Sequence, residues 1–418
     1  MSGKKINENK SLISAYDIAI VGGGVVGCAV ARCMALEGAK VILLEKAPDI
    51  LDGASKGNSA ILHTGFDAPV GSLEQKCVSS GYKEYLEIHE SLNLPLLKSS
   101  AMVVAWSKEQ EDKFESIIAK GLDNGVEDLS FLSKKEILAK EPELSANAKA
   151  AISIPREYVI DPWSAPFAYL KQAVENGGRV LFNAEVIGGE FDGSNWLLNT
   201  SQGDVRAGQV INCAGLYGDI VDKNVLGSAQ FEIKPRKGQF VVFDKAAGKL
   251  LNSIILPVPT RRTKGIVLFP TIFGNIVVGP TAEEQESRND ASVDRAVLSS
   301  LLEQAVEMLP ALANIPTTAT YAGIRSASDK THYRIIHNYD QNWITLGGIR
   351  STGLTGALGI ARHVCELLAK QSIEFDKIEN PLIPKVPNLA EHLPRDWQTP
   401  GYGEIVCHCE CYQCWNLS

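Results

Sequence analysis

Residues 16–45 read YDIAIVGGGVVGCAVARCMALEGAKVILLE, and this stretch decides the fold. An apolar strand, expected over residues 16–21, runs directly into the glycines of residues 22–27. Small residues typical of a closely packed helix continue to Gly38, and a second apolar strand over residues 40–44 is followed at once by an acid. Strand, glycine turn, helix, strand and acid in this order predict a βαβ unit that binds a dinucleotide.

Each conspicuous residue of this unit has a physical role in such a site. Gly22 allows the tight turn, Gly24 lets the backbone approach a pyrophosphate, and Gly27 lets the helix pack closely on the strand. The helix N-terminus then faces the anion. Glu45 can accept hydrogen bonds from ribose hydroxyls, which argues against a 2′-phosphate and leaves both FAD and NAD open.

The bulk composition narrows the classes of protein. At 418 residues, with 45% hydrophobic and 22% charged residues, the chain has the composition of a globular protein with room for two domains. Its 41 basic and 49 acidic residues give a net charge of −8 without a long basic block, which argues against a nucleic acid partner. Residues 1–14 resemble neither a signal peptide nor a transit peptide, and no stretch is apolar for long enough to span a bilayer. We therefore expect a cytoplasmic protein, with peripheral membrane contact left open.

The loop after the second strand favours FAD. Residues 53–65 read GASKGNSAILHTG, and such small residues let an extended backbone cross beneath a flat ring system. Here the sequence resembles the D-amino-acid oxidase-like superfamily of FAD enzymes, in its glycerol-3-phosphate and L-2-hydroxyglutarate dehydrogenase-like branch. The resemblance implies that Asn58, Ser59 and His63 lie along the flavin.

The resemblance recurs over nearly the whole chain. It implies that a strand over residues 179–187 contacts the adenine side of FAD through Val186. It also implies that residues 210–219, VINCAGLYGD, bind the cofactor around Gly215. The late stretch WITLGGIRSTGLTG is a strand, a glycine turn and a helix start, and a helix N-terminus there can present amides to the carbonyl edge of the flavin. A plain strand-to-helix connection would not need so many glycines. The implied cofactor residues in this stretch are Gly348, Gly353, Leu354 and Thr355.

The fold class expected is α/β, with a Rossmann-like FAD-binding domain and an inserted, mainly antiparallel β-sheet substrate domain. Alternating apolar runs over residues 239–243, 254–257, 266–269 and 276–278 indicate the antiparallel sheet. The predicted FAD-binding stretches are 15–90, 150–230 and 320–380, the predicted substrate or lid stretches are 91–149 and 231–319, and residues 381–418 form a C-terminal tail.

Candidate substrate residues follow from the chemistry of hydride transfer, which needs an anchor for the substrate and an acceptor for its proton. His63 is the first candidate for the base, although a structural hydrogen bond or a packing contact would equally explain it. Arg325, in the stretch YAGIR, resembles an arginine that reaches over the flavin in the family, and a guanidinium matches a carboxylate or a phosphate by paired hydrogen bonds. Arg350 and Lys237 are the secondary candidates for this anion site.

The C-terminal cysteines form a motif of their own. The stretch IVCHCE resembles the start of an iron–sulphur domain attached to some glycerol-3-phosphate dehydrogenase-like proteins, but two further cysteines follow almost at once. A disordered remnant is the favoured interpretation, because so short a segment has little chain to shape a site. A cluster or zinc ion is the alternative, and its ligands would be Cys407, Cys409, Cys411 and Cys414.

Together these features predict an FAD-dependent dehydrogenase that oxidises a small anionic secondary alcohol. The resemblance implies glycerol 3-phosphate first, and L-2-hydroxyglutarate or another hydroxy or amino acid second. The electron acceptor is left open among a quinone, an electron-transfer protein and oxygen. A flavin-carrying subunit without substrate chemistry is the alternative from another class.

Overall fold

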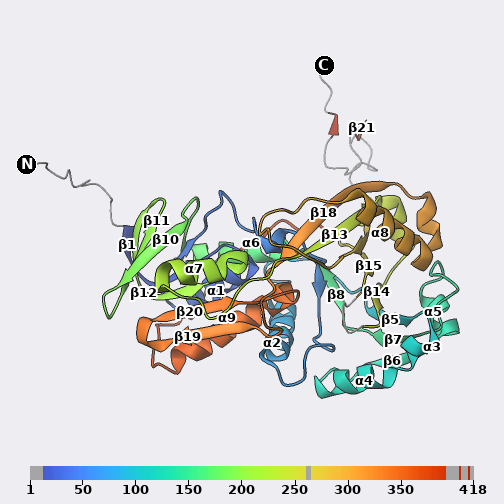
Figure 1. The fold of residues 1–418 in the computed structure, drawn as a ribbon, viewed down its shortest axis with the longest axis horizontal. Helices are drawn as coiled ribbons and strands as arrows, with labels where there is room; N and C mark the ends of the chain where they lie inside the picture. Colours follow the sequence, from blue (N-terminus) through green and yellow to red (C-terminus); the bar gives the residue numbers. More distant parts are fainter. Residues whose placement is uncertain (1–12, 260–264, 392–403, 406–412, 415–418) are drawn as a thin grey trace, which may run out of the picture.

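The computed structural model describes residues 13–259 and 265–391, together with two short strands near the C-terminus, β21 (Glu404–Ile405) and β22 (Gln413–Cys414). The described chain is built around two large sheets, which lie side by side with their helices packed against them (Figure 1).

The first sheet contains eight strands, which are β1 (Ile13–Val21), β2 (Val41–Leu44), β9 (Arg179–Leu181), β10 (Val186–Phe191), β11 (Trp196–Thr200), β12 (Gly203–Asn212), β19 (Arg334–Asn338) and β20 (Trp343–Gly347). Its core is parallel, in the order β9-β2-β1-β12-β20. The strands β10, β11 and β19 add antiparallel pairs at its edges. A parallel core of this kind is typical of a dinucleotide-binding domain.

Apolar layers cover both faces of this sheet, which explains why the second half of β1, Ile18 to Val21, is apolar at every position. Ile18 and Ile20 pack into one cluster with the helices, whereas Ala19 and Val21 pack into another on the opposite face. The helices in the first cluster are α1 (Val25–Leu36), α2 (Leu73–Ile88), α6 (Ser164–Glu175) and α9 (Gly353–Ala369).

One predicted strand is two strands in the structure. The sequence predicts a single strand over residues 179–187, but β9 ends at Leu181 and β10 begins at Val186. Between them Asn183 has a φ of +55°, a left-handed conformation that interrupts an extended chain. The amide of Ala184 then donates to the carbonyl of Glu45, 2.8 Å away, which ties this turn to the end of β2.

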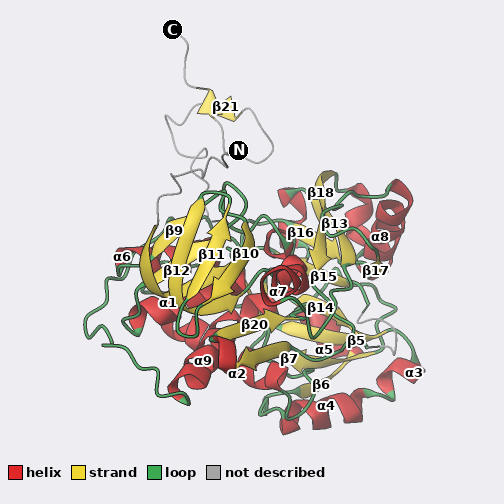
Figure 2. Ribbon diagram, turned by 60° about the vertical axis from the view of Figure 1, so that its left-hand side comes forward, coloured by secondary structure: helices red, strands yellow, loops and turns green. Residues whose placement is uncertain are grey.

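The second sheet contains nine strands, which are β5 (Ala101–Ala105), β6 (Ser130–Ser133), β7 (Ala150–Ile154), β13 (Arg236–Phe243), β14 (Ile254–Pro257), β15 (Val267–Pro270), β16 (Ile276–Gly279), β17 (Glu283–Glu284) and β18 (Thr317–Arg325). All of its pairings are antiparallel except that of β14 with β5. Helix α8 (Arg295–Met308) packs beside β13 (Figure 2). The predicted fold class is therefore confirmed.

The predicted domain limits differ from the sheet pairing at two places. Strands β7 and β18 pair within the second sheet, although residues 150–154 and 320–325 fall in the predicted FAD-binding stretches. An apolar strand at these boundaries has the same sequence pattern whichever sheet it joins. The pattern therefore does not show to which of the two sheets such a strand belongs.

A small sheet connects the loop after β2 to the second sheet. It contains β3 (Ile61–Leu62), β4 (Leu96–Leu97) and β8 (Tyr158–Ile160), with β8 in the middle. In the chain, between β4 and β8, lie the short helices α3 (Lys108–Glu111), α4 (Phe114–Asp123) and α5 (Lys134–Lys140). This sheet brings residues just before β8 beside residues just after β3.

The predicted tail site lies outside what the structure describes. Cys407, Cys409 and Cys411 are not among the described residues, and the side chain of Cys414 is not described either. Within the described part of the chain, no group of three or more His, Cys, Asp or Glu residues could hold a metal ion. The helices there are all too short or too polar to cross a bilayer.

Candidate active site

A large cavity of about 550 Å³ extends along the carboxyl end of the first sheet toward the second sheet. It is lined by the glycine turn, the loop after β2, the turn after β12, the end of β18 and the start of α9. The sequence-predicted residues that line it are Gly22, Gly24, Glu45, Asn58, Ser59, Val186, Gly215, Arg325, Arg350, Gly353 and Leu354. Those that do not line it are Gly27, His63, Lys237, Gly348 and Thr355. Chain segments that are far apart in sequence therefore meet at one site.

The three glycines of the turn differ in what surrounds them. A Cβ on Gly22, whose φ is +108°, would lie 2.7 Å from the carbonyl oxygen of Cys213, and one on Gly27 would lie 1.9 Å from that of Gly22. These two positions are closed by the protein's own backbone. A Cβ on Gly24 would meet only the Ser55 hydroxyl, at 3.2 Å, so Gly24 faces the cavity. The backbone at Gly24 is extended, with φ of −73°, which any residue can adopt. The turn therefore does not require glycine at this position, and the missing side chain leaves space in the cavity.

Glu45 is held at the cavity by backbone amides. Its Oε2 accepts a hydrogen bond from Gly23 at 2.5 Å, and its Oε1 accepts one from Ala47 at 2.8 Å. The residue is only 8% exposed, yet it lines the cavity. A fixed carboxylate has further lone pairs that can accept hydrogen bonds from two ribose hydroxyls.

The loop after β2 is braced by its own side chains. Asn58 donates through Nδ2 to the carbonyl of Ser55 at 2.8 Å and accepts through Oδ1 from the amide of Ala60 at 2.7 Å. The Ser55 hydroxyl accepts from the Val25 amide at 3.0 Å, at the first residue of α1. Asn58 therefore shapes the loop, and Ser55, which the sequence analysis missed, lies where an anion would meet the helix N-terminus.

This loop also crosses β18 at a contact between two glycines. A Cβ on Gly57 would lie 2.6 Å from the Cα of Gly323, and a Cβ on Gly323 would lie 2.0 Å from the carbonyl oxygen of Gly57. Two residues beyond Gly323, β18 ends with Arg325 at the cavity. The glycine contact thus fixes the distance between the FAD-side loop and the substrate sheet.

The start of α9 faces the cavity with Gly353 and Leu354, whereas Thr355 turns to the protein. The Thr355 hydroxyl accepts from the backbone amide of His63 at 3.0 Å and donates to the carbonyl of Ile61 at 3.3 Å. Gly348 has a φ of +66°, so it makes the turn between β20 and α9 possible. These two residues position the helix and the loop and do not line the cavity.

His63 is paired with a buried carboxylate. Its Nδ1 lies 2.9 Å from Oε2 of Glu157, which is fully buried. The other carboxylate oxygen of Glu157 accepts from both the amide and the hydroxyl of Thr64, at 2.6 and 2.7 Å. Glu157 therefore fixes the orientation of the imidazole. Sequence reasoning missed it because the two residues meet only through the pairing of β3 with β8.

Three arginines line the cavity, and their partners differ. Arg288 forms two hydrogen bonds to the carboxylate of Asp219, at 2.6 and 2.8 Å, which joins the loop after β17 to helix α7 (Gly218–Leu226). Arg350 lies 3.5 Å from Glu74. Within the described residues Arg325 has no ion pair; its Nη2 donates to the carbonyl oxygen of Thr281 at 2.8 Å.

Burial changes the electrostatics of Arg325. Desolvation, and after it the neighbouring Arg236, lower the pKa of Arg325 to about 10, which keeps it protonated at neutral pH. Arg236 itself is held by Glu284 on the adjacent strand. Lys237, the other predicted anion ligand on β13, pairs with Ile324 of β18 and does not line the cavity.

Comparison with known proteins identifies the family. The family model for FAD dependent oxidoreductases matches residues 17–367. The chain belongs to this family.

Relatives with named activities extend the comparison. A glycerol 3-phosphate dehydrogenase of Caloramator mitchellensis is 30% identical over 403 residues, which cover 94% of this chain and 84% of that protein. An L-2-hydroxyglutarate dehydrogenase of Indibacter alkaliphilus is 29% identical, with 69% of this chain and 73% of that protein covered. Among solved structures, the dithionite-reduced L-α-glycerophosphate oxidase from Mycoplasma pneumoniae with FAD bound is similar with a TM-score of 0.83, at 29% identity, and the match covers 90% of this chain and all of that chain.

The cavity fits the cofactor of the family. The open position at Gly24, the α1 N-terminus beside it and the fixed carboxylate of Glu45 match a pyrophosphate and a ribose. The start of α9 supplies a second helix N-terminus farther along the cavity. FAD is therefore the cofactor, as predicted, and these residues are the ones that would hold it.

We expect Gly24→Val to give a folded protein without FAD, because the extended backbone accepts a side chain whose volume then occupies the pyrophosphate space. Gly27→Ala should instead impair folding, since its Cβ would meet backbone. Visible absorbance after desalting measures the bound FAD, and circular dichroism measures the fold. Gly188→Ala is the control, because its Cβ would have no neighbour nearer than 3.7 Å. Full FAD content in Gly24→Val would contradict this assignment.

Proposed function

We propose that the protein oxidises a small anionic secondary alcohol, with glycerol 3-phosphate as the first candidate, by transferring hydride to FAD. The observation that carries the proposal is Arg325, a half-buried cation at the cavity with no ion pair among the described residues. The named activities of the relatives support the same substrate class.

Arg325 suits the substrate's anion because its positive charge is not already compensated. Arg288 and Arg350 line the same cavity but lie within ion-pair distance of Asp219 and Glu74. An unpaired buried charge is costly, and an anionic ligand would offset that cost. The guanidinium also has donors beyond the one given to Thr281, so it can bind a phosphate or carboxylate through two of them.

His63 and Glu157 supply the proton chemistry in this proposal. When the imidazole carries its proton on Nδ1 and donates to Glu157, the basic lone pair is on Nε2. His63 does not itself line the cavity, so in this proposal the bound alcohol extends beyond the lining to the imidazole. Nε2 then accepts the hydroxyl proton, and the buried carboxylate of Glu157 stabilises the resulting imidazolium. Bound FAD supplies the hydride acceptor, so the alcohol loses one hydride and one proton and becomes a ketone.

L-2-hydroxyglutarate is the second candidate, because a carboxylate would meet the same guanidinium and a relative carries that activity. We propose a quinone, an electron-transfer protein or oxygen as the final electron acceptor. We also propose a cytoplasmic location, since Cys28, Cys33, Cys77, Cys213 and Cys365 are free thiols, which is typical of a reducing compartment.

Under anaerobic conditions glycerol 3-phosphate should bleach the flavin absorbance of the FAD-loaded protein, whereas glycerol, which lacks the anion, should not at the same concentration. Faster bleaching by L-2-hydroxyglutarate would replace the first candidate with the second. If dithionite reduces the flavin but no secondary alcohol does, the protein is an electron carrier and the proposal is wrong.

Replacement of Arg325 by Lys should raise KM roughly 30-fold or more, the equivalent of about 2 kcal/mol, because lysine keeps the charge but loses the paired geometry. FAD content should be unchanged. Arg236→Lys is the matched control, since Arg236 neighbours Arg325 on the paired strand but is bound to Glu284 and does not line the cavity. An equal rise in KM in both variants would show that Arg325 does not bind the substrate's anion.

For the proton, His63→Asn should slow flavin reduction at saturating substrate by about 100-fold or more and flatten its pH dependence. Glu157→Gln keeps the shape of the buried side chain but not its charge, so it should lower kcat with little change in KM. Stopped-flow reduction over a range of pH measures both effects. A reduction rate that stays within a few-fold of the parent's in His63→Asn would leave the imidazole with a structural role only.

A further inference from the structure

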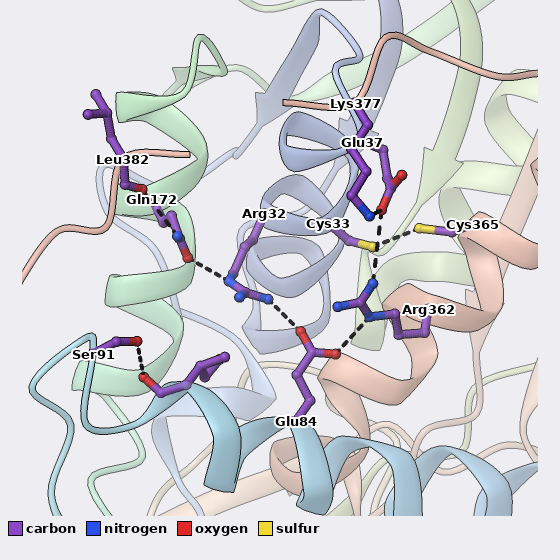
Figure 3. Close-up of polar contacts among 11 residues, drawn as sticks. Arg32, Cys33, Glu37, Glu84, Ser91, Gln172, Arg362, Cys365, Lys377 and Leu382 are labelled. Carbon is purple, nitrogen blue, oxygen red and sulfur yellow. Dashed lines mark hydrogen bonds and ion pairs between the residues drawn. The ribbon is translucent and has the colours of Figure 1, made fainter. Parts of the chain in front are cut away.

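Two thiols that do not line the cavity meet in the FAD-binding domain. Cys33 on α1 and Cys365 on α9 are separated by 332 residues in the chain, yet their Sγ atoms lie 2.7 Å apart (Figure 3). Cys33 is 6% exposed, and Cys365 is partly buried. The remaining described thiols, Cys28, Cys77 and Cys213, are buried without such a contact.

Charged side chains hold the two helices around this pair. Glu84 of α2 accepts from Arg32 of α1 at 2.6 Å and from Arg362 of α9 at 2.9 Å (Figure 3). Glu37, just after α1, binds Lys377 at 3.2 Å and lies 3.9 Å from Arg362. These ion pairs fix the relative position of the helices. They therefore hold the two thiols next to each other.

A small surface pocket of about 100 Å³ reaches one of the two thiols, that of Cys33. Its lining includes Cys33, Glu37, Arg362 and Lys377. A molecule of the size of hydrogen peroxide fits such a space, and Arg362 and Lys377 favour an anionic leaving group there. None of these residues lines the FAD cavity, so the thiol pair is a separate site.

We propose that Cys33 and Cys365 are a reversible disulfide site that a peroxide oxidises. One thiolate attacks the O–O bond of the peroxide, which gives a sulfenic acid and releases one oxygen as water. The second thiol attacks the sulfenic sulfur, the S–S bond forms and a second water leaves. Two thiols are oxidised by two electrons in total, and one hydrogen peroxide is reduced to two waters.

The proposed bond would tie together the two helices that reach the cofactor. Val25 at the start of α1 and Gly353 at the start of α9 both line the cavity, whereas the cysteines lie two or more turns further along each helix. A cross-link between residues so far apart in the chain restricts the unfolded state strongly. Oxidation should therefore stabilise the FAD-binding domain and slow the loss of FAD.

The test uses the FAD-loaded full chain, treated with hydrogen peroxide and then alkylated. We expect a peptide that joins Cys33 to Cys365 in non-reducing digests, and its loss after dithiothreitol. The thermal midpoint should rise by about 5 °C on oxidation and return on reduction. FAD release, followed by its fluorescence, should slow at least several-fold in the oxidised protein.

Cys33→Ser and Cys365→Ser should each abolish the cross-link and the rise in thermal midpoint, while Cys77→Ser, a buried thiol of α2 outside the pair, should leave both intact. Peptide mapping also separates this pair from the four cysteines near the C-terminus. The proposal is overturned if oxidised protein contains cross-links only among those four, or if Cys33 and Cys365 stay open to alkylation after unfolding of peroxide-treated protein.

Discussion

Where α9 crosses α2, backbone meets backbone. A Cβ on Gly81 would lie 2.1 Å from the carbonyl oxygen of Thr355, and a Cβ on Gly359 would lie 2.0 Å from that of Cys77. Any side chain at either glycine would push the helices apart. The start of α9 lines the cavity, and Thr355 binds the backbone of His63. The positions of α9 and of His63, the candidate base, therefore depend on this one close crossing.

The parts of the site that the sequence predicts are those formed by residues close together in the chain. Gly22, Gly24 and Glu45 were predicted at the cofactor and line the cavity, because the roles of glycine and acid in a βαβ unit depend on near neighbours. Val186, which also lines the cavity, was implied only by the family resemblance. Ser55, Glu157 and Arg288 were missed, because their partners come from distant segments.

The family resemblance predicts which residues lie near the cavity, but it does not predict which groups their side chains contact. Asn58 was expected along the flavin, and it does line the cavity, yet its side chain is fully engaged in holding its own loop. Thr355 and Gly348 were expected at the cofactor, and both instead shape the protein around it. A motif predicts which segment reaches a site, whereas the direction of each side chain depends on the tertiary packing.

Helix α9 is held by different kinds of contact along its length. Near the cavity its contacts with α2 are steric, through Gly81 and Gly359, which leave no room for adjustment. At the far end they are ionic, through Glu84 and its two arginines, and there the thiols of Cys33 and Cys365 also meet. A covalent bond at the ionic end would limit rotation of the helices about the glycine crossing, because packed helices move as rigid bodies. Oxidation of the two thiols would in this way act on the cofactor site through α1 and α9, whose first residues line the cavity.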